Sequence, residues 1–358
     1  MTERERFHRT MHFDHPDRVP YGEIIGIAEE TLQRWRGEGL PVDVHPDPYF
    51  GFDRREDLRI ALDPVPSFPV EVISEDADYR VEQGADGVWR RFGRRGEATY
   101  QFVRFPLRSR EDWQAFRKRL NPSSPCRYPM YWEDRKRTLE GRAHPLFIRA
   151  GSVYGWLRDW MGLEGISMAL YDDESWVAGM MEEVTDFIVA TLAPAVEQVP
   201  GIDYAILWED MAGKNGPFLS PAHFRRLMVP QYRRITGLLR SHGIDTILVD
   251  CDGNHDSLND LWLEAGVNGV HPLEVAAGED PVALRKRYGK DLLLIGGIDK
   301  RALARGPRAI EEEVMGKAPY LLEQGGWMPS VDHAVPADVS FANYRYYLDL
   351  MARLAEGR

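Results

Sequence analysis

A strand-and-helix unit repeated in the carboxyl-terminal half constrains the fold more than any other feature of this sequence. Five times, an amphipathic segment ends at or near a glycine, and a short apolar run follows that finishes in polar or charged residues. These apolar runs are Ile202–Trp208, Thr246–Val249, Val267–Val270, Leu292–Ile295 and Trp327–Val331. The runs do not alternate between apolar and polar residues, which is typical of parallel strands buried on both faces. The repeat therefore predicts a parallel sheet in which helices follow the strands.

The segments between these runs carry the signals of helices. Apolar residues recur at helical spacing over Met180–Leu192, and Ser220 followed by Pro221 is typical of a helix start. Pro230 inside that second helix predicts a kink, because proline lacks the N–H that a helix interior requires. A last helix is expected over residues 340–355.

The amino-terminal half predicts the rest of the fold and an insertion. Arg18–Ile24 and Pro145–Ala150 resemble strands, and Ile27–Arg36 resembles a helix. Residues 40–130 are rich in Pro, Asp and Arg, and we expect there a small antiparallel element that partly caps the barrel. The fold class expected is α/β, a single (β/α)₈ TIM barrel that forms one domain over residues 1–358.

Composition and charge exclude several classes of protein. A formal net charge of −12 argues against a nucleic-acid partner, which requires a basic face. Only Cys126 and Cys251 are present, too few for a disulfide framework, so a reducing compartment is expected. The charged start lacks the apolar run of a signal peptide, and no window approaches the apolar length of a membrane span. We therefore expect a cytoplasmic protein with no membrane partner.

Acids and histidines follow the predicted strands. In a barrel, residues at the carboxyl ends of the strands share one mouth, where active sites lie. Carboxylates crowded there require a metal, a cationic substrate or raised pKa values. Each residue could instead cap the next helix or meet solvent. The residues concerned are Glu209, Asp210, Asp250, Asp252, His271, Glu274, Asp299, Asp332 and His333.

The densest of these segments suggests a metal site. Asp250 and Asp252 are two residues apart on a strand, so both can face the mouth while Cys251 faces the helices. With His333 they could bind a divalent cation, since oxygen and imidazole donors suit Zn, Mn or Mg. The alternative is that Asp252 or Asn254 caps the following helix and Cys251 is a small buried filler.

Other strand-end residues are candidates for catalysis and for substrate binding. Glu209, Asp210, Asp252 and His333 could transfer protons or support the metal site. Arg149 and Lys214 could hold a substrate carboxylate, or could pair with neighbouring acids instead. Trp208 could line an apolar pocket, although core packing explains it equally well. The residues expected to bind substrate are Arg149, Lys214, Trp208, His271 and Glu274.

Several motifs together resemble the uroporphyrinogen decarboxylase superfamily. They are Glu5-Arg6-Phe7, His15 to Pro20, Glu209 to Ala212, Lys214 to Pro217, Leu263 to Val267, His271 to Glu274, Leu294 to Asp299 and Asp332 to Pro336. The resemblance covers nearly the whole chain except about residues 40–130. It implies a (β/α)₈ barrel with one of two activities. One is cofactor-free decarboxylation of porphyrinogen acetates; the other is zinc-assisted methyl transfer involving a corrinoid protein or another thiol or pterin acceptor.

The sequence departs from both patterns at informative places. Where the true decarboxylases carry Arg-Gln-Ala-Gly-Arg, this chain reads Tyr21 to Gly26 and is acidic, which argues against a porphyrinogen substrate. The zinc methyltransferases show His-x-Cys-Gly where this chain reads Asp250 to Gly253. Their distal cysteine is also replaced, by the neighbourhood of Asp332 and His333. An oxygen-rich metal site is therefore expected in place of a zinc thiolate, with zinc favoured by the resemblance alone.

These observations lead to one main hypothesis and two alternatives. The main hypothesis is methyl transfer from a small methylated substrate, with a divalent ion held by Asp250, Asp252 and His333. A corrinoid would take part only through a partner protein, and a homodimer is left open. The alternatives are a cofactor-free decarboxylase of a carboxylated substrate, and a barrel that binds a ligand or a corrinoid partner without turnover.

Overall fold

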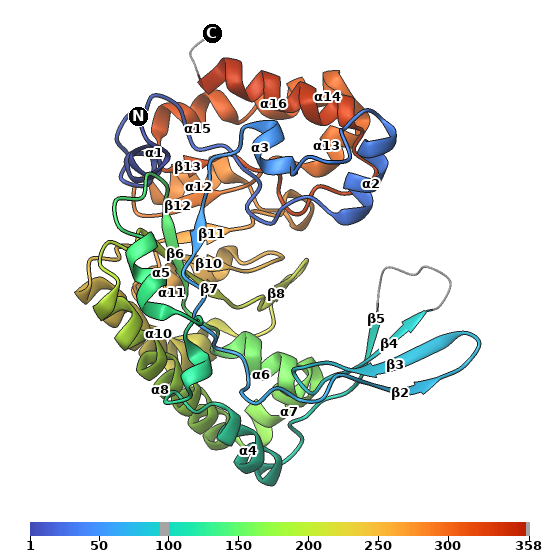
Figure 1. The fold of residues 1–358 in the computed structure, drawn as a ribbon, viewed down its shortest axis with the longest axis vertical. Coiled ribbons are helices and arrows are strands. Elements are labelled where there is room, and N and C mark those ends of the chain that lie inside the picture. Colours follow the sequence, from blue (N-terminus) through green and yellow to red (C-terminus); the bar gives the residue numbers. More distant parts are fainter. Residues whose placement is uncertain (94–99, 356–358) are drawn as a thin grey trace.

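Seven parallel strands form the central sheet of this mixed α/β protein, whose computed structural model describes residues 1–93 and 100–355 (Figure 1). Every neighbouring pair in the sheet is parallel. In spatial order the strands are β1 (Glu56–Asp57), β6 (Leu146–Arg149), β7 (Tyr204–Trp208), β10 (Thr246–Asp250), β11 (Gly269–His271), β12 (Leu293–Ile295) and β13 (Trp327–Met328). Each of the five predicted apolar runs overlaps one of these strands, so the parallel sheet expected from the repeat is confirmed.

Helices connect the strands and pack on the outer face of the sheet (Figure 1). They are α6 (Tyr154–Met161), α7 (Leu163–Asp172), α8 (Glu174–Gln198), α9 (Pro221–His223), α10 (Val229–Ser241), α11 (Asn259–Glu264), α12 (Pro281–Tyr288), α13 (Lys300–Arg305), α14 (Pro307–Met315), α15 (Ala318–Gln324) and α16 (Phe341–Ala355). Shorter helices precede β6, namely α2 (Glu29–Gly37), α3 (Pro46–Phe50), α4 (Arg110–Phe116) and α5 (Trp132–Thr138). Within the described residues, none of the helices has the length and apolar character needed to cross a bilayer.

The predicted helix start at Ser220 is present, and the helix is irregular next to Pro230, where the kink stays a prediction. Ser220 caps α9, because its hydroxyl oxygen accepts a hydrogen bond from the His223 N–H at 3.2 Å. Between α9 and α10 the chain forms a π-helical segment, Phe224–Met228, and Pro230 is the second residue of α10. A proline cannot donate the main-chain hydrogen bond of a regular helix, so the chain widens immediately before it.

An irregular segment takes the place of the predicted strand Arg18–Ile24 and joins the two edges of the sheet. On the β1 side, Asp53 N–H donates to the main-chain oxygen of Tyr21 at 2.9 Å. On the β13 side, the Glu23 carboxylate accepts from Val331 N–H at 2.8 Å, and Ile24 N–H donates to the Ser330 hydroxyl at 3.3 Å. On the β13 side, the Glu23 carboxylate and the Ser330 hydroxyl take the hydrogen bonds of the main-chain N–H groups, so no regular ladder forms there. The sheet has seven regular strands over the described ranges, not the eight expected.

Two apolar cores lie on either side of the sheet. The larger lies between the strands and the surrounding helices. The smaller lies on the inner face, where Tyr204, Leu248 and Met328 pack with residues of α1 (Glu3–Met11). Phe7 of α1 stacks near Tyr204, the first residue of β7, with ring centroids 4.6 Å apart. Helix α1 therefore covers the amino ends of the strands, which leaves the carboxyl ends for the site.

The expected insertion contains a four-stranded antiparallel sheet. Its strands are β2 (Glu71–Glu75), β3 (Tyr79–Gln83), β4 (Trp89–Gly93) and β5 (Tyr100–Arg104). Figure 1 shows this sheet as an arm beside α6 and α7, and Leu107 N–H after β5 donates to the main-chain oxygen of Trp160 at 3.0 Å. Strand β1 lies inside the predicted range 40–130 but belongs to the parallel sheet, so the inserted element is smaller than expected. All five residues of β5 are exposed, and the capping role stays a prediction.

Candidate functional site

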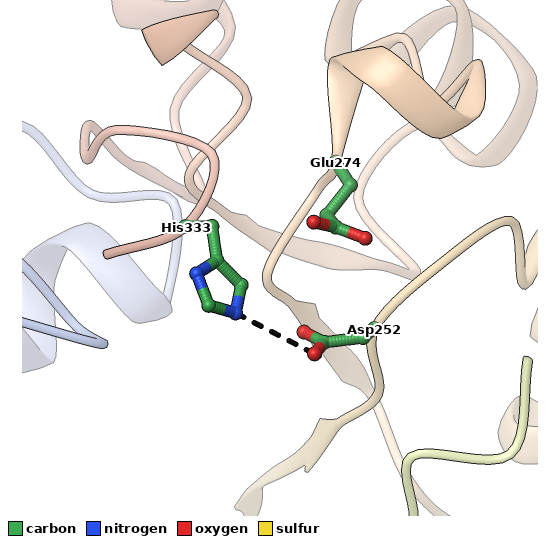
Figure 2. Close-up of side chains that lie close together, drawn as sticks. All are labelled: Asp252, Glu274 and His333. Atoms are coloured by element: carbon green, nitrogen blue, oxygen red, sulfur yellow. Dashed lines mark ion pairs between the residues drawn. The ribbon is translucent and has the colours of Figure 1, made fainter. Parts of the chain in front are cut away.

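Three loops at the carboxyl ends of the strands bring Asp252, Glu274 and His333 together. Each side chain offers one metal-binding atom, and these atoms all lie within 4.8 Å of one another. Figure 2 shows the three side chains pointing toward a common point, with His333 Nε2 3.5 Å from Asp252 Oδ2. All three are partly buried. The sequence places them in the loops after β10, β11 and β13, so the cluster exists only in the folded sheet.

Main-chain geometry fixes these loops against one another. Gly253 has a φ of +82°, and a Cβ there would lie 2.7 Å from the main-chain oxygen of Ala212. Its N–H donates to Glu274 Oε2 at 2.9 Å, which links the loops after β10 and β11. The buried Asp332 carboxylate accepts from Val275 N–H and Lys300 N–H, each at 3.1 Å, and links the segments after β11, β12 and β13. The cluster therefore rests on a rigid frame.

The predicted crowding of acids is present and changes their protonation. Burial first, and then the charges of Asp252 and Asp210, raise the pKa of Asp250 to about 7. Burial also raises the pKa of Asp210, although the Arg158 guanidinium, 2.8 Å from its carboxylate, opposes the shift. The hydrogen bond to Asp252 raises the pKa of His333. Such a concentration of negative charge favours a cation at this place.

The group of side chains that the structure brings together differs by one residue from the predicted metal-ligand set. Asp252 and His333 come together as expected, but the third member of the group is Glu274, which we had assigned to substrate binding. Asp250 is not in this group, and its Oδ1 lies 3.9 Å from His271 Nδ1. Cys251 is fully buried, and burial raises the pKa of its thiol, so it provides no thiolate. Two carboxylates and one imidazole fit a divalent ion that prefers oxygen and nitrogen donors.

Glu209 and Asp210, both predicted to be catalytic, have different surroundings. Glu209 is fully buried, and its carboxylate accepts three main-chain hydrogen bonds of 2.7 to 3.0 Å from Val153, Tyr154 and Gly155 at the start of α6. These are the contacts of a helix-capping carboxylate. Asp210 adopts a φ of +39° and pairs with Arg158 beside the cluster. A catalytic role for either residue stays a prediction.

The residues assigned to substrate binding are not all in one place. Arg149 and His271 line a cavity of about 580 Å³ at the inner face of the sheet. Arg149 is exposed and its Nε lies 2.9 Å from Asp57 Oδ2. Lys214 is exposed in the turn between β8 (Ala212–Gly213) and β9 (Gly216–Pro217), away from this cavity. Trp208 is partly buried, and the Arg158 guanidinium lies over its ring, with the guanidinium carbon 5.6 Å from the ring centre.

Comparison with known proteins identifies the family. The model of the family described as uroporphyrinogen decarboxylase (URO-D) matches residues 58–354. The chain belongs to the URO-D family. A methyltransferase from Methanosarcina mazei has the same fold, with a TM-score of 0.59 over 99% of each chain and 13% sequence identity. No curated protein matches the chain.

Three residues of this URO-D family member lie at the site but were missed in the sequence. Lys300 Nζ is 3.6 Å from Glu274 Oε1 and 4.0 Å from Asp332 Oδ1. Its signal was its position directly after the strand-end residue Asp299. Arg55 and Tyr204 line the cavity. Arg55 was missed because the short strand β1 lay within the predicted insertion, and Tyr204 because its run was interpreted only as core.

Proposed function

We propose that this URO-D family member transfers a methyl group from a small methylated substrate and that Asp252, Glu274 and His333 hold a divalent ion for this reaction. The main support is that three ligand atoms from separate loops lie within 4.8 Å of one another. The Methanosarcina mazei methyltransferase, which shares the fold, supports the choice of reaction. In this proposal residues 18–27 close the sheet into a (β/α)₈ barrel.

The roles of the surrounding residues follow from their contacts. A bound divalent ion would act as a Lewis acid on the substrate or the methyl acceptor. Lys300 and the Gly253 N–H hold the Glu274 carboxylate from two sides, which fixes its orientation. Arg149 and His271 would bind substrate in the adjoining cavity. The donor set favours an oxygen-rich site, which zinc, manganese or magnesium could occupy, and a corrinoid would arrive only on a partner protein.

Metal titration of ligand variants tests the assignment. The protein is stripped with a chelator and titrated with Zn²⁺ or Mn²⁺ by calorimetry. We expect Asp252→Asn and Glu274→Gln each to weaken binding by roughly tenfold or more, because each removes an anionic ligand. Asp250→Asn is the matched control and should leave the affinity nearly unchanged, since Asp250 is not in the group. Absence of metal binding by the unaltered protein, or equal losses in all three variants, would contradict the ligand set.

Turnover then tests the reaction. Chelator-treated and metal-restored protein is incubated with O-, N- and S-methylated carboxylic acids and an acceptor, and demethylated product is measured by mass spectrometry. We expect product only after metal is restored. Binding of these compounds without product under any condition would favour the non-catalytic alternative, a barrel that binds a ligand or a corrinoid partner.

One observation favours decarboxylation as the second candidate. The cationic groups Lys300 and His333 lie near Glu274 and Asp252 and could balance their charges without a metal. Arg55 and Arg149 line the cavity and could hold a substrate carboxylate. This candidate predicts that carbon dioxide is released from a carboxylated substrate equally well with and without the chelator. We expect no product from uroporphyrinogen itself, because the segment Tyr21 to Gly26 is acidic where the resemblance to the true decarboxylases places arginines.

A further inference from the structure

The wall of the cavity beside the cluster contains arginines and, among the described residues, buried polar groups without hydrogen-bond partners. Its volume is about 580 Å³, within the range of pockets for small organic molecules. The strands contribute Phe147, Arg149, Tyr204, Ile206, Asp250 and His271 to its wall. The remaining side is formed by residues 22–25 and 52–55, where the irregular segment meets the start of β1, together with Glu3, His45, Asp47 and Pro48. Asp250 and His271 connect this cavity to the loops that carry the cluster.

Two buried carboxylates of the cavity wall, those of Asp53 and Glu23, already accept hydrogen bonds from groups outside the cavity. Asp53 accepts hydrogen bonds from Arg6 at 2.8 Å, from Arg18 at 2.6 Å and from Tyr21 N–H at 2.6 Å. Glu23 accepts from Val331 N–H at 2.8 Å and from the hydroxyls of Ser330 and Tyr344 at 2.6 and 2.8 Å. Asp53 therefore has cationic partners of its own, and Glu23 is held by neutral donors, with a further electrostatic contribution from the Arg55 charge.

Arg55 is a cation of the cavity wall with unused donors. Its guanidinium donates one hydrogen bond, to the main-chain oxygen of Glu23 at 2.8 Å. No described carboxylate lies within 4.0 Å of it, whereas Arg54 pairs with Glu56 at 3.0 Å and Arg149 pairs with Asp57 at 2.9 Å. Arg55 is partly buried, so this charge is only partly screened by solvent. A partly buried guanidinium with free donors is suited to an anionic ligand.

Two more polar groups in the same wall are buried without a partner. Tyr204 and His271 are 1% and 2% exposed. Neither the Tyr204 hydroxyl nor either ring nitrogen of His271 has a hydrogen-bond partner in the described structure. Burying polar groups in this way costs stability unless a ligand satisfies them. Burial and the nearby Arg55 lower the pKa of His271 to about 3, so its ring is neutral and carries one N–H donor.

We propose that this cavity binds the carboxylate of a small organic acid, with Arg55 as the cationic anchor and Tyr204 and His271 as hydrogen-bond donors. The inference builds on the proposed function and names the class of its substrate: a small methylated acid whose carboxylate lies at Arg55. A single unpaired cation suits one anionic group. It does not suit a porphyrinogen, which presents many carboxylates.

Matched anionic and neutral probes test the proposal on metal-free protein. Benzoate is compared with benzamide, and acetate with acetamide, by titration calorimetry. We expect the acids to bind and the amides to bind much more weakly. Arg55→Gln should weaken benzoate binding by about tenfold or more, since it removes a charge-assisted hydrogen bond, and Arg55→Lys should weaken it less. Tyr204→Phe should weaken it by a smaller factor, and Arg308→Gln, a matched loss of an exposed guanidinium outside the cavity, should have no effect.

Three results would overturn the inference. They are no binding of either acid, equal binding of each acid and its amide, and unchanged benzoate affinity in both Arg55 variants. The measurement uses no metal and no turnover. Carboxylate binding that survives when the cluster fails to bind metal would leave the substrate class standing and remove only the metal-dependent methyl transfer. Metal binding with no carboxylate binding would leave the metal site standing and remove the proposed substrate class.

Discussion

Burial sets the charge of several side chains around the cavity. Within one small volume it raises the pKa of Asp250 to about 7 and lowers the pKa of His271 to about 3. Both groups move toward their neutral forms, because the interior solvates an ion poorly. Burial also raises the pKa of Glu209, although three main-chain donors at the start of α6 oppose this shift. None of these shifts can be deduced from residue type alone.

The buried His271 should make the stability of the protein depend on pH. Its pKa lies below that of an unfolded histidine, near 6.5, so below that pH the unfolded chain binds a proton that the folded one does not. Stability from this residue is complete above pH 6.5 and falls toward pH 3, by at most about 1.4 kcal/mol per pH unit. Arg55 strengthens the effect and the charge of Asp252 opposes it.

Comparison with His271→Gln isolates this contribution, because glutamine does not titrate. Urea unfolding of both proteins is measured from pH 7.5 to 4.5 in the absence of ligand. We expect the unaltered protein to lose more stability over this range than the variant. Parallel pH curves for the two proteins would show that His271 has the same pKa in the folded and unfolded states and would contradict its assignment as a neutral donor at low pH.

The segment around Glu23 shows how an element can be extended without being a strand. Its apolar character predicted a strand over Arg18–Ile24, but the Glu23 carboxylate and the Ser330 hydroxyl take the hydrogen bonds that a ladder would use. Periodicity reports burial and extension, and it does not report which group satisfies each N–H. By contrast, the five strands of the repeat were predictable, because each is bounded by a glycine and a polar end within a few residues.

Loss of the Glu23 carboxylate should destabilise the joint between β1 and β13. Glu23→Ala leaves the Val331 N–H and the Tyr344 hydroxyl buried without their acceptor. We expect the free energy of unfolding to fall by about 2 to 4 kcal/mol, measured by urea denaturation. Glu29→Ala is the control: Glu29 is exposed on α2, so the change should stay within about 0.5 kcal/mol. Equal stability of the two variants would mean that this carboxylate does not hold the edges together.

At the scale of the whole molecule, the arm formed by β2 to β5 extends beside α6 and α7 (Figure 1). Phe102 and Val103 are each 51% exposed on β5, one of the two edge strands of the arm. Exposed side chains away from other features contribute little to stability. The arm therefore presents these apolar side chains to solvent or to a partner, and the expected capping role stays a prediction.

Polar substitution on the arm tests whether it covers the cavity. We expect Phe102→Ser with Val103→Ser to leave benzoate affinity and the midpoint of thermal unfolding unchanged, measured by calorimetry and circular dichroism. The physical reason is that both side chains are half exposed and lie on a strand that pairs only with β4. Weaker benzoate binding in this double variant would support the capping role predicted for residues 40–130.

The sequence by itself determined the parallel sheet with its helices, the family, and the loops from which Asp252, Glu274 and His333 come. It could do so because strand ends are marked locally and parallel strands carry their polar ends to one edge. Only the tertiary structure decided that Glu274 joins the cluster in place of Asp250, that Glu209 caps α6, and that Arg55 faces a cavity. Those outcomes depend on distances between loops far apart in the chain and on which partner each buried polar group finds, and neither quantity is encoded in local spacing.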